Sequence, residues 1–127
     1  MSDFHDQNRL LFVIRAANFQ STADQAFTKI GTFTNYMAGR IIGVRVSGGA
    51  TVACTGGIYT AAAKGGNAIV GAAQSWLGMS GAGKMQDATL SALVVTDWQT
   101  ATPILSLTTG SIGVVTGDVY IFGMILE

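Results

Sequence analysis

Charged residues are scarce in this sequence. Asp, Glu, Lys and Arg make up 11% of the 127 residues, whereas an ordinary soluble domain contains about 25%. The seven basic residues balance seven acidic ones and are scattered along the chain. No basic cluster is available to neutralise a phosphate backbone, so the sequence argues against nucleic acid as a partner. With so little charge repulsion to keep monomers apart, we expect part of the surface to be covered by another chain.

Cysteine and histidine are almost missing. The single cysteine, Cys54, and the single histidine, His5, cannot build a disulfide framework or a zinc site within one chain. Cys54 alternates with Val52 in an apolar segment, which predicts a buried thiol; a reactive or intermolecular thiol is the alternative. His5 lies in a polar N-terminal stretch, where a Ser-His-Asp arrangement would not be held rigidly.

Long apolar runs are also missing. The charge-free stretches Gly65–Gly83 and Trp98–Gly117 approach the length of a membrane helix, but Gly, Thr, Ser and Gln interrupt them. The first residues, Met-Ser-Asp-Phe-His-Asp, do not resemble the basic start of a secretory signal. The sequence therefore predicts neither membrane insertion nor secretion.

Catalytic motifs are incomplete. Gly78–Met85 matches the glycines and the lysine of a phosphate-binding loop, but Met85 stands where that motif needs Ser or Thr to hold magnesium. Asp87, Asp97 and Asp118 are far apart in the sequence and each borders a turn, which is typical of turn-capping carboxylates and not of a catalytic pair. We expect no catalytic residues, no cofactor and no enzymatic activity.

Strand-like segments with period-two patterning fill the rest of the chain, separated by many of the 17 glycines. The predicted strands are Arg9–Ala16, Gln25–Ile30, Arg40–Val46, Val52–Tyr59, Ala68–Gln74, Ala88–Val94, Pro103–Thr108 and Asp118–Leu126. Thr60–Lys64 and Asp87–Leu93 have short helices as alternatives. The regular spacing predicts an all-β fold, a two-sheet jelly-roll-like β-sandwich of about eight strands formed by residues 9–127 as a single domain. In such a fold the first and last strands pair antiparallel.

The last predicted strand is apolar on both faces. Val119, Ile121 and Ile125 alternate with Tyr120, Phe122, Met124 and Leu126. Such a strand lies between two layers or has one face covered by another subunit. We predict an interface formed by Tyr120, Phe122 and Met124, together with Phe4. Phe4 is the only aromatic residue of residues 1–8, which we expect to form an extended arm that becomes ordered against a neighbouring chain.

Aromatic side chains suggest one further role, a sugar-binding face. The candidates are Trp76, Trp98, Tyr36, Tyr59 and Tyr120. Trp76 follows an apolar segment, which favours a core or interface position, whereas Trp98 lies in a predicted loop and is expected to be partly exposed. Carbohydrate binding stays open as an alternative.

Three sequence segments, Gly57–Gly66, Thr102–Gly110 and Asp118–Gly123, resemble segments of a group of small tailed-bacteriophage virion proteins. The likeness runs from about Asp24 to the C-terminus. Within this group, the chain most resembles the head decoration, or cement, proteins. That resemblance implies a jelly-roll sandwich that forms a small homo-oligomer, a dimer or trimer. It would be made in the host cytoplasm and would bind the major capsid protein on the outer surface of the capsid in the virion. A tail- or fibre-associated subunit and a carbohydrate-binding host-attachment module are the alternatives.

Overall fold

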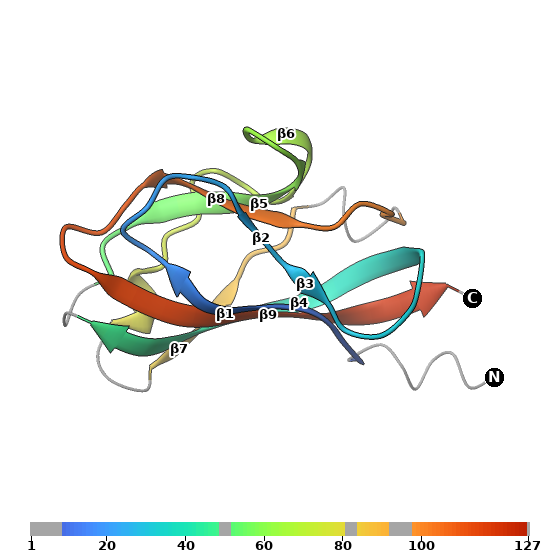
Figure 1. Cartoon of the computed structure of the whole chain (residues 1–127), viewed down its shortest axis with the longest axis horizontal. Helices are drawn as coiled ribbons and strands as arrows, with labels where there is room; N and C mark the ends of the chain where they lie inside the picture. The colour runs from blue at the N-terminus through green and yellow to red at the C-terminus, as the bar shows by residue number, and fades with distance from the viewer. Residues whose placement is uncertain (1–8, 49–51, 81–83, 92–97, 127) are drawn as a thin grey trace.

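The computed structural model describes residues 9–48, 52–80, 84–91 and 98–126, which form two antiparallel β-sheets packed face to face (Figure 1). The strands are β1 (Arg9–Asn18), β2 (Gln25–Ala26), β3 (Thr28–Lys29), β4 (Asn35–Gly48), β5 (Thr55–Ala61), β6 (Gly65–Val70), β7 (Met85–Ala88), β8 (Ile104–Thr109) and β9 (Val115–Leu126). The only helical element of the described residues is a 3₁₀ turn, η2 (Leu77–Met79). The prediction of an all-β sandwich is confirmed.

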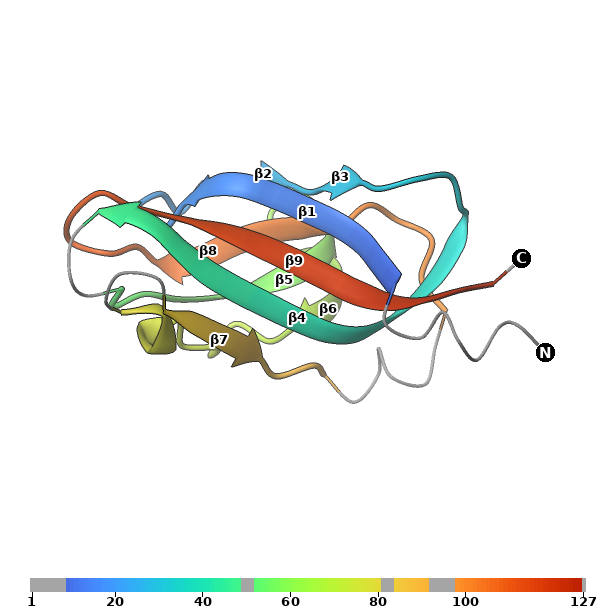
Figure 2. The same cartoon turned by 90° about the horizontal axis from the view of Figure 1, so that it is seen from below.

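The strand order is that of a jelly roll. One sheet has the order β3-β1-β9-β4-β7 and the other the order β2-β8-β5-β6, so that strands from both ends of the chain interleave as in two joined Greek keys. β1 pairs antiparallel with β9, from Arg9 opposite Gly123 to Asn18 opposite Thr116. This pairing, visible at the centre of Figure 2, confirms the predicted adjacency of the first and last strands.

The chain crosses between the sheets on both sides of the sandwich. On one side β2 pairs with β8 and β3 pairs with β1, and the buried Phe27 stands between them. On the other side β7 pairs with β4, and Leu90 then bridges to Val70 of β6. Strands that change sheet at such corners shorten the free edges to which another chain could add.

Aromatic side chains fill the space between the sheets. The ring centroid of Phe12 lies 4.9 Å from that of Tyr36, edge to face. Trp76 is fully buried, and its ring centroid lies 5.6 Å from that of Phe19. Gly43 of β4 faces this tryptophan: a Cβ at Gly43 would lie 3.0 Å from the Trp76 ring and 2.7 Å from the Met79 sulfur. The glycine therefore makes room for the largest side chain of the core.

Several strand boundaries differ from those predicted. The strand expected at 25–30 is divided into β2 and β3 by the change of sheet at Phe27. The strand expected at 68–74 ends at Val70, because a turn closed by the Gln74 N–H donating to the Gly71 carbonyl oxygen follows it. Residues 62–64, part of a possible helix, form a hairpin turn in which Ala63 and Lys64 have φ of 55° and 60°.

The strand expected at 88–94 is shifted toward the N-terminus. β7 covers Met85–Ala88, so the start of the alternative helix at 87–93 is extended, and 92–94 lie outside the described residues. The predicted arm, residues 1–8 with Phe4, also lies outside them and stays a prediction.

Candidate interaction surface

β9 alternates strictly between buried and half-exposed residues. Its odd-numbered residues from Val115 to Ile125 face the sandwich core, whereas Tyr120, Phe122 and Met124 are half-exposed on the other side. The two faces are those expected from the sequence. β9 is the central strand of the five-stranded sheet (Figure 2), so these three side chains lie in the middle of its outer surface.

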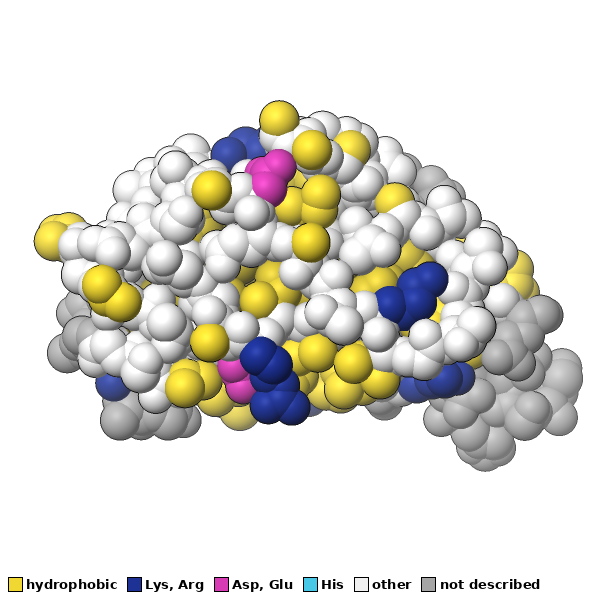
Figure 3. All heavy atoms as spheres, viewed as in Figure 1, with side chains coloured by type: hydrophobic (Ala, Val, Ile, Leu, Met, Phe, Trp, Pro, Cys, Tyr) yellow, Lys and Arg dark blue, Asp and Glu magenta, His cyan; other side chains and the backbone are white. Residues whose placement is uncertain are grey.

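Neighbouring strands extend this apolar surface. Tyr120 lies opposite Val13 of β1 and Ile42 of β4. Across β4, Val44 lies opposite Met85 of β7, which is 51% exposed. The apolar residues in register on this side of the sheet, named here the outer face, are Leu10, Val13, Met37, Ile42, Val44, Met85, Tyr120, Phe122, Met124 and Leu126. Seen from the side, hydrophobic side chains gather along the margin formed by this sheet (Figure 3).

The strand β4 is apolar on both of its faces. It turns Tyr36 and Ile41 toward the interior, where both are fully buried, and places Ile42 and Val44 on the outer face. In an antiparallel sheet with one solvated face the residues on that face are usually polar, and a large contiguous exposed apolar patch marks an interaction site.

Charged side chains that lie among the apolar residues of the outer face are paired within the chain. Arg40 Nε donates to Asp87 Oδ1 at 2.8 Å, and Arg40 Nη2 donates to Asp87 Oδ2 at 3.3 Å. The hydrogen bond from Arg40 lowers the pKa of the Asp87 carboxyl group. Both side chains are more than half exposed, so this pair contributes little to stability, but it leaves this part of the face neutral.

A second pair stands beside Tyr120. Arg15 Nη1 lies 3.8 Å from Asp118 Oδ2, and the Tyr120 hydroxyl group donates to the same oxygen at 3.0 Å. The Arg15 guanidinium lies 5.9 Å from the centre of the Tyr120 ring. Burial raises the pKa of Tyr120, and its hydrogen bond to Asp118 adds to that shift. Tyr120 is therefore held in one orientation, with its ring available on the outer face.

The acidic residues considered for catalysis are separated. Asp87 lies on β7 and Asp118 on β9, with β4 between those strands, and each contacts an arginine. Among the described residues, neither is paired with a second carboxylate, so these two form no acid–base pair. His5 and Asp97 lie outside the described residues. No group of three potential metal ligands occurs in the part of the chain that the structure describes.

The glycine-rich segment 78–85 does not form a strand–loop–helix unit in its described part. It starts in η2 and ends at Met85, the first residue of β7, while 81–83 lie outside the described residues. Lys84 is exposed, and its carbonyl oxygen accepts a hydrogen bond from the Arg45 N–H at 3.0 Å. A phosphate-binding helix N-terminus is therefore missing where the motif requires one.

The structure brings together one polar cluster that sequence reasoning missed. Lys64 Nζ donates to the Ser106 hydroxyl group at 3.0 Å, and Asp24 accepts a hydrogen bond from the Ala63 N–H at 2.8 Å. That backbone bond, with Ser106 and then Lys64, lowers the pKa of Asp24. Ser106 is only 1% exposed, so the cluster closes the β5–β6 hairpin onto β8 and leaves no accessible nucleophile. No signal in the sequence links residues so far apart.

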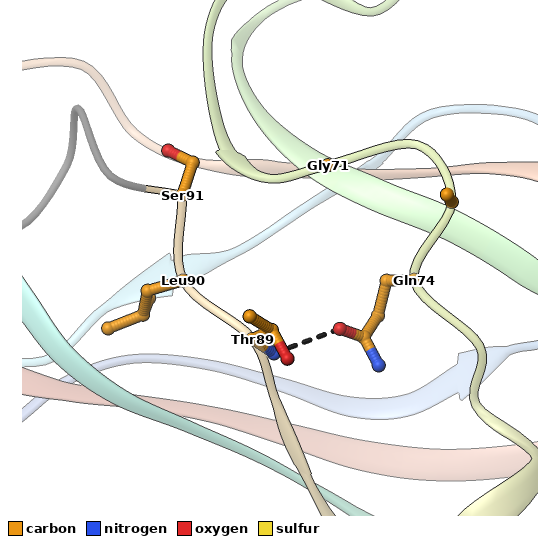
Figure 4. A pocket seen from close by; sticks show the side chains of 6 residues that line it. Gly71, Gln74, Thr89, Leu90 and Ser91 are labelled. Atoms are coloured by element: carbon orange, nitrogen blue, oxygen red, sulfur yellow. Dashed lines mark hydrogen bonds between the residues drawn. The ribbon is translucent and has the colours of Figure 1, made fainter.

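A shallow hollow lies between the segment that follows β6 and the segment that follows β7 (Figure 4). It has a volume of about 360 Å³ and is lined by Gly71, Ala73, Gln74, Thr89, Leu90 and Ser91. Gln74 Oε1 accepts a hydrogen bond from the Thr89 N–H at 2.9 Å, which joins the two walls. No ionisable side chain lines the hollow, so it offers no acid, base or metal ligand.

The aromatic candidates for sugar binding are mostly interior. Trp76 and Tyr36 are fully buried and Tyr59 is 6% exposed, so these three cannot form an external stacking platform. Trp98 is 38% exposed, and Tyr120 is half-exposed on the outer face. The prediction that Trp98 is partly exposed is confirmed, and Trp76 occupies a core position.

Cys54 is buried, as the sequence predicted, with 2% of its surface exposed. Burial raises the pKa of its thiol from about 9 to about 11. Because the folded state holds this proton more tightly, the associated stability is complete below about pH 9 and is lost as the pH rises through about 11.

We expect Cys54→Ala to flatten this alkaline loss by on the order of 1–2 kcal/mol, measured by urea unfolding across that range. Equal pH dependence of both proteins would contradict the assignment.

Among the described residues, no helix has the length and apolar character needed to span a membrane. Comparison with protein-family models, with curated proteins and with solved structures finds no significant match to this chain. The functional conclusion therefore depends on the jelly-roll-like sandwich and its outer face.

Proposed function

We propose that this chain is a structural virion protein, a capsid decoration or cement protein that binds the outside of an icosahedral phage head and stabilises it. Its partners are the major capsid protein and further copies of itself. The outer face is the observation that carries this proposal. It is broad and largely apolar, and the charges that lie on it are already paired within the chain. A surface of this kind suits assembly.

Such a protein acts through mass action. A ligand that binds only the closed shell opposes shell opening by an amount that grows with its concentration relative to its Kd, about 2.7 kcal/mol per site at 100 times Kd. Many sites on one particle add their contributions. Because the charges around the outer face are paired internally, we expect added salt to weaken binding only slightly.

The test is the copy number and the heat resistance of purified particles. We expect the protein in numbers comparable with the major capsid protein, and we expect particles that lack it to break at lower temperature. A copy number close to that of tail components indicates the tail or fibre subunit instead. Equal heat resistance with and without the protein contradicts the cement role.

Two variants connect this test to the outer face. Phe122→Asp places a charge in the middle of the apolar surface through which copies of the chain assemble. It is expected to abolish addition of the assembled protein to protein-deficient shells, since an unpaired buried charge is costly. Thr108→Asp, at an exposed position on β8 in the other sheet, is the matched control and is expected to bind normally. Glycan binding that is lost in Tyr120→Ala would instead support the carbohydrate-binding module.

A further inference from the structure

We propose that a second copy of this chain covers the outer face, in a symmetric face-to-face dimer whose two-fold axis passes near Ile42 and Tyr120. This inference rests on the proposed function in one respect, that the outer face is an assembly surface. It adds the identity of the first partner and the geometry of the contact.

The size of the outer face is close to that of one partner's share in a stable dimer. Its residues extend along β9 from the level of Asp118 to Leu126 and span four neighbouring strands from β1 to β7. With about 3.3 Å per residue and about 4.8 Å between strands, the face measures roughly 30 Å by 20 Å. The accessible area of a surface covered with side chains exceeds its flat projection, so the face approaches the roughly 800 Å² per partner of a standard interface.

The charge distribution favours a partner of the same kind. Arg40 is paired with Asp87 and Arg15 with Asp118 within the face itself, so these charges are balanced before any partner arrives. A charged partner would leave its own groups without counter-ions on contact, which is costly once they are buried. A second copy presents an equally neutral and apolar face, and no unpaired charge is buried.

The fold directs contact to this face. Because the chain crosses between the sheets on both sides of the sandwich, lateral strand addition has only short edges available. The surface of the opposite sheet around β8 is polar by contrast, because it carries the exposed Thr108 and the Lys64 side chain, which covers Ser106. If the five-stranded sheets of two copies pack about 10 Å apart through their outer faces, each copy buries aromatic and aliphatic side chains in the contact.

Two-fold symmetry makes a specific prediction about crosslinking. In a symmetric interface a residue close to the axis meets its own copy. In a Cys54→Ala background, which removes the only native thiol, Ile42→Cys is expected to form a covalent dimer on mild oxidation. Thr108→Cys, on the other sheet, is the control and is expected to stay uncrosslinked. Equal crosslinking at both positions would overturn the proposed geometry.

Sedimentation equilibrium of the full chain provides the second test. We expect a dimer at micromolar concentration, and we expect Phe122→Asp to raise the dissociation constant at least 100-fold with little change in melting temperature. Thr108→Asp should remain dimeric. A monomer at all concentrations, or a closed trimer, overturns the inference. A monomer that dimerises only after deletion of residues 2–8 shows that these residues cover the face, which also overturns it.

The two proposals fail separately. If the protein is monomeric and Phe122→Asp still abolishes shell binding, the outer face contacts the shell and only the dimer is wrong. If the protein is a dimer with the expected crosslink but particles contain no copies of it, the decoration function is wrong and the dimer stands.

Discussion

Replacement of Trp76 by alanine is expected to lower the free energy of unfolding by about 4 kcal/mol. The side chain is fully buried, its ring packs 5.6 Å from that of Phe19, and its Nε1 donates to the Gly56 carbonyl oxygen at 3.1 Å. Alanine would open a cavity between the sheets and leave that buried carbonyl group without its partner. Since a domain of this size is stable by about 5–15 kcal/mol, the variant should be close to unfolding.

Urea denaturation followed by circular dichroism measures this loss. The second tryptophan supplies the matched control, because Trp98 is 38% exposed. Trp98→Ala is expected to cost less than about 1 kcal/mol. Similar losses for the two variants would contradict the assignment of Trp76 to the core. In a Trp98→Phe background, the remaining fluorescence should show the blue-shifted emission of a buried indole until the protein unfolds.

Replacement of Gly123 by alanine is expected to lower the free energy of unfolding by about 3 kcal/mol. Gly123 lies on the inward side of β9, where a Cβ would overlap the carbonyl oxygen of Met37 and approach Ala38 Cα to 3.0 Å. Both are backbone atoms of β4, so no rotation of a side chain can relieve the overlap. The two strands would have to separate locally, which breaks hydrogen bonds at the centre of the sheet.

Thermal unfolding is the measurement for this variant, and the expected fall in melting temperature is about 10 °C. Gly113→Ala is the control, because a Cβ at Gly113 has no atom within 4 Å outside its chain neighbours. We expect the control to change the melting temperature by no more than about 2 °C. An unchanged melting temperature for Gly123→Ala would show that β4 and β9 tolerate a wider separation.

The two faces of β9 could be predicted from the sequence, because successive side chains of a strand point to opposite sides. Its pairing with β1 followed from the predicted jelly-roll arrangement, in which the first and last strands are neighbours. The start of β4 at Asn35 could not be predicted. A register shift between Ala38 and Arg40 interrupts its alternation, and the pattern becomes regular only after it. The division of 25–30 into two strands could not be predicted either. It arises because the residues before Phe27 pair with β8 in one sheet and those after it pair with β1 in the other.

Only part of the outer face could be predicted in the same way. Tyr120, Phe122 and Met124 follow from the pattern of one strand. Met37 and Met85 join them through the register of β4 with β9 and with β7, and register between distant segments is set by the assembled core and not by local sequence. A surface that spans several strands therefore becomes visible only in the structure.

The central position of β9 has a consequence for synthesis of the protein in a cell. β9 separates β1 from β4 and pairs with both, yet it is the last of the described strands to leave the ribosome. Until residues 115–126 emerge, β1 and β4 have no common partner, and the sheet they belong to cannot close. Folding therefore waits for nearly the whole chain and depends on contacts between distant segments, which makes it slow. A nascent chain stalled before Val115 would display unpaired apolar strands and would depend on chaperones to avoid aggregation.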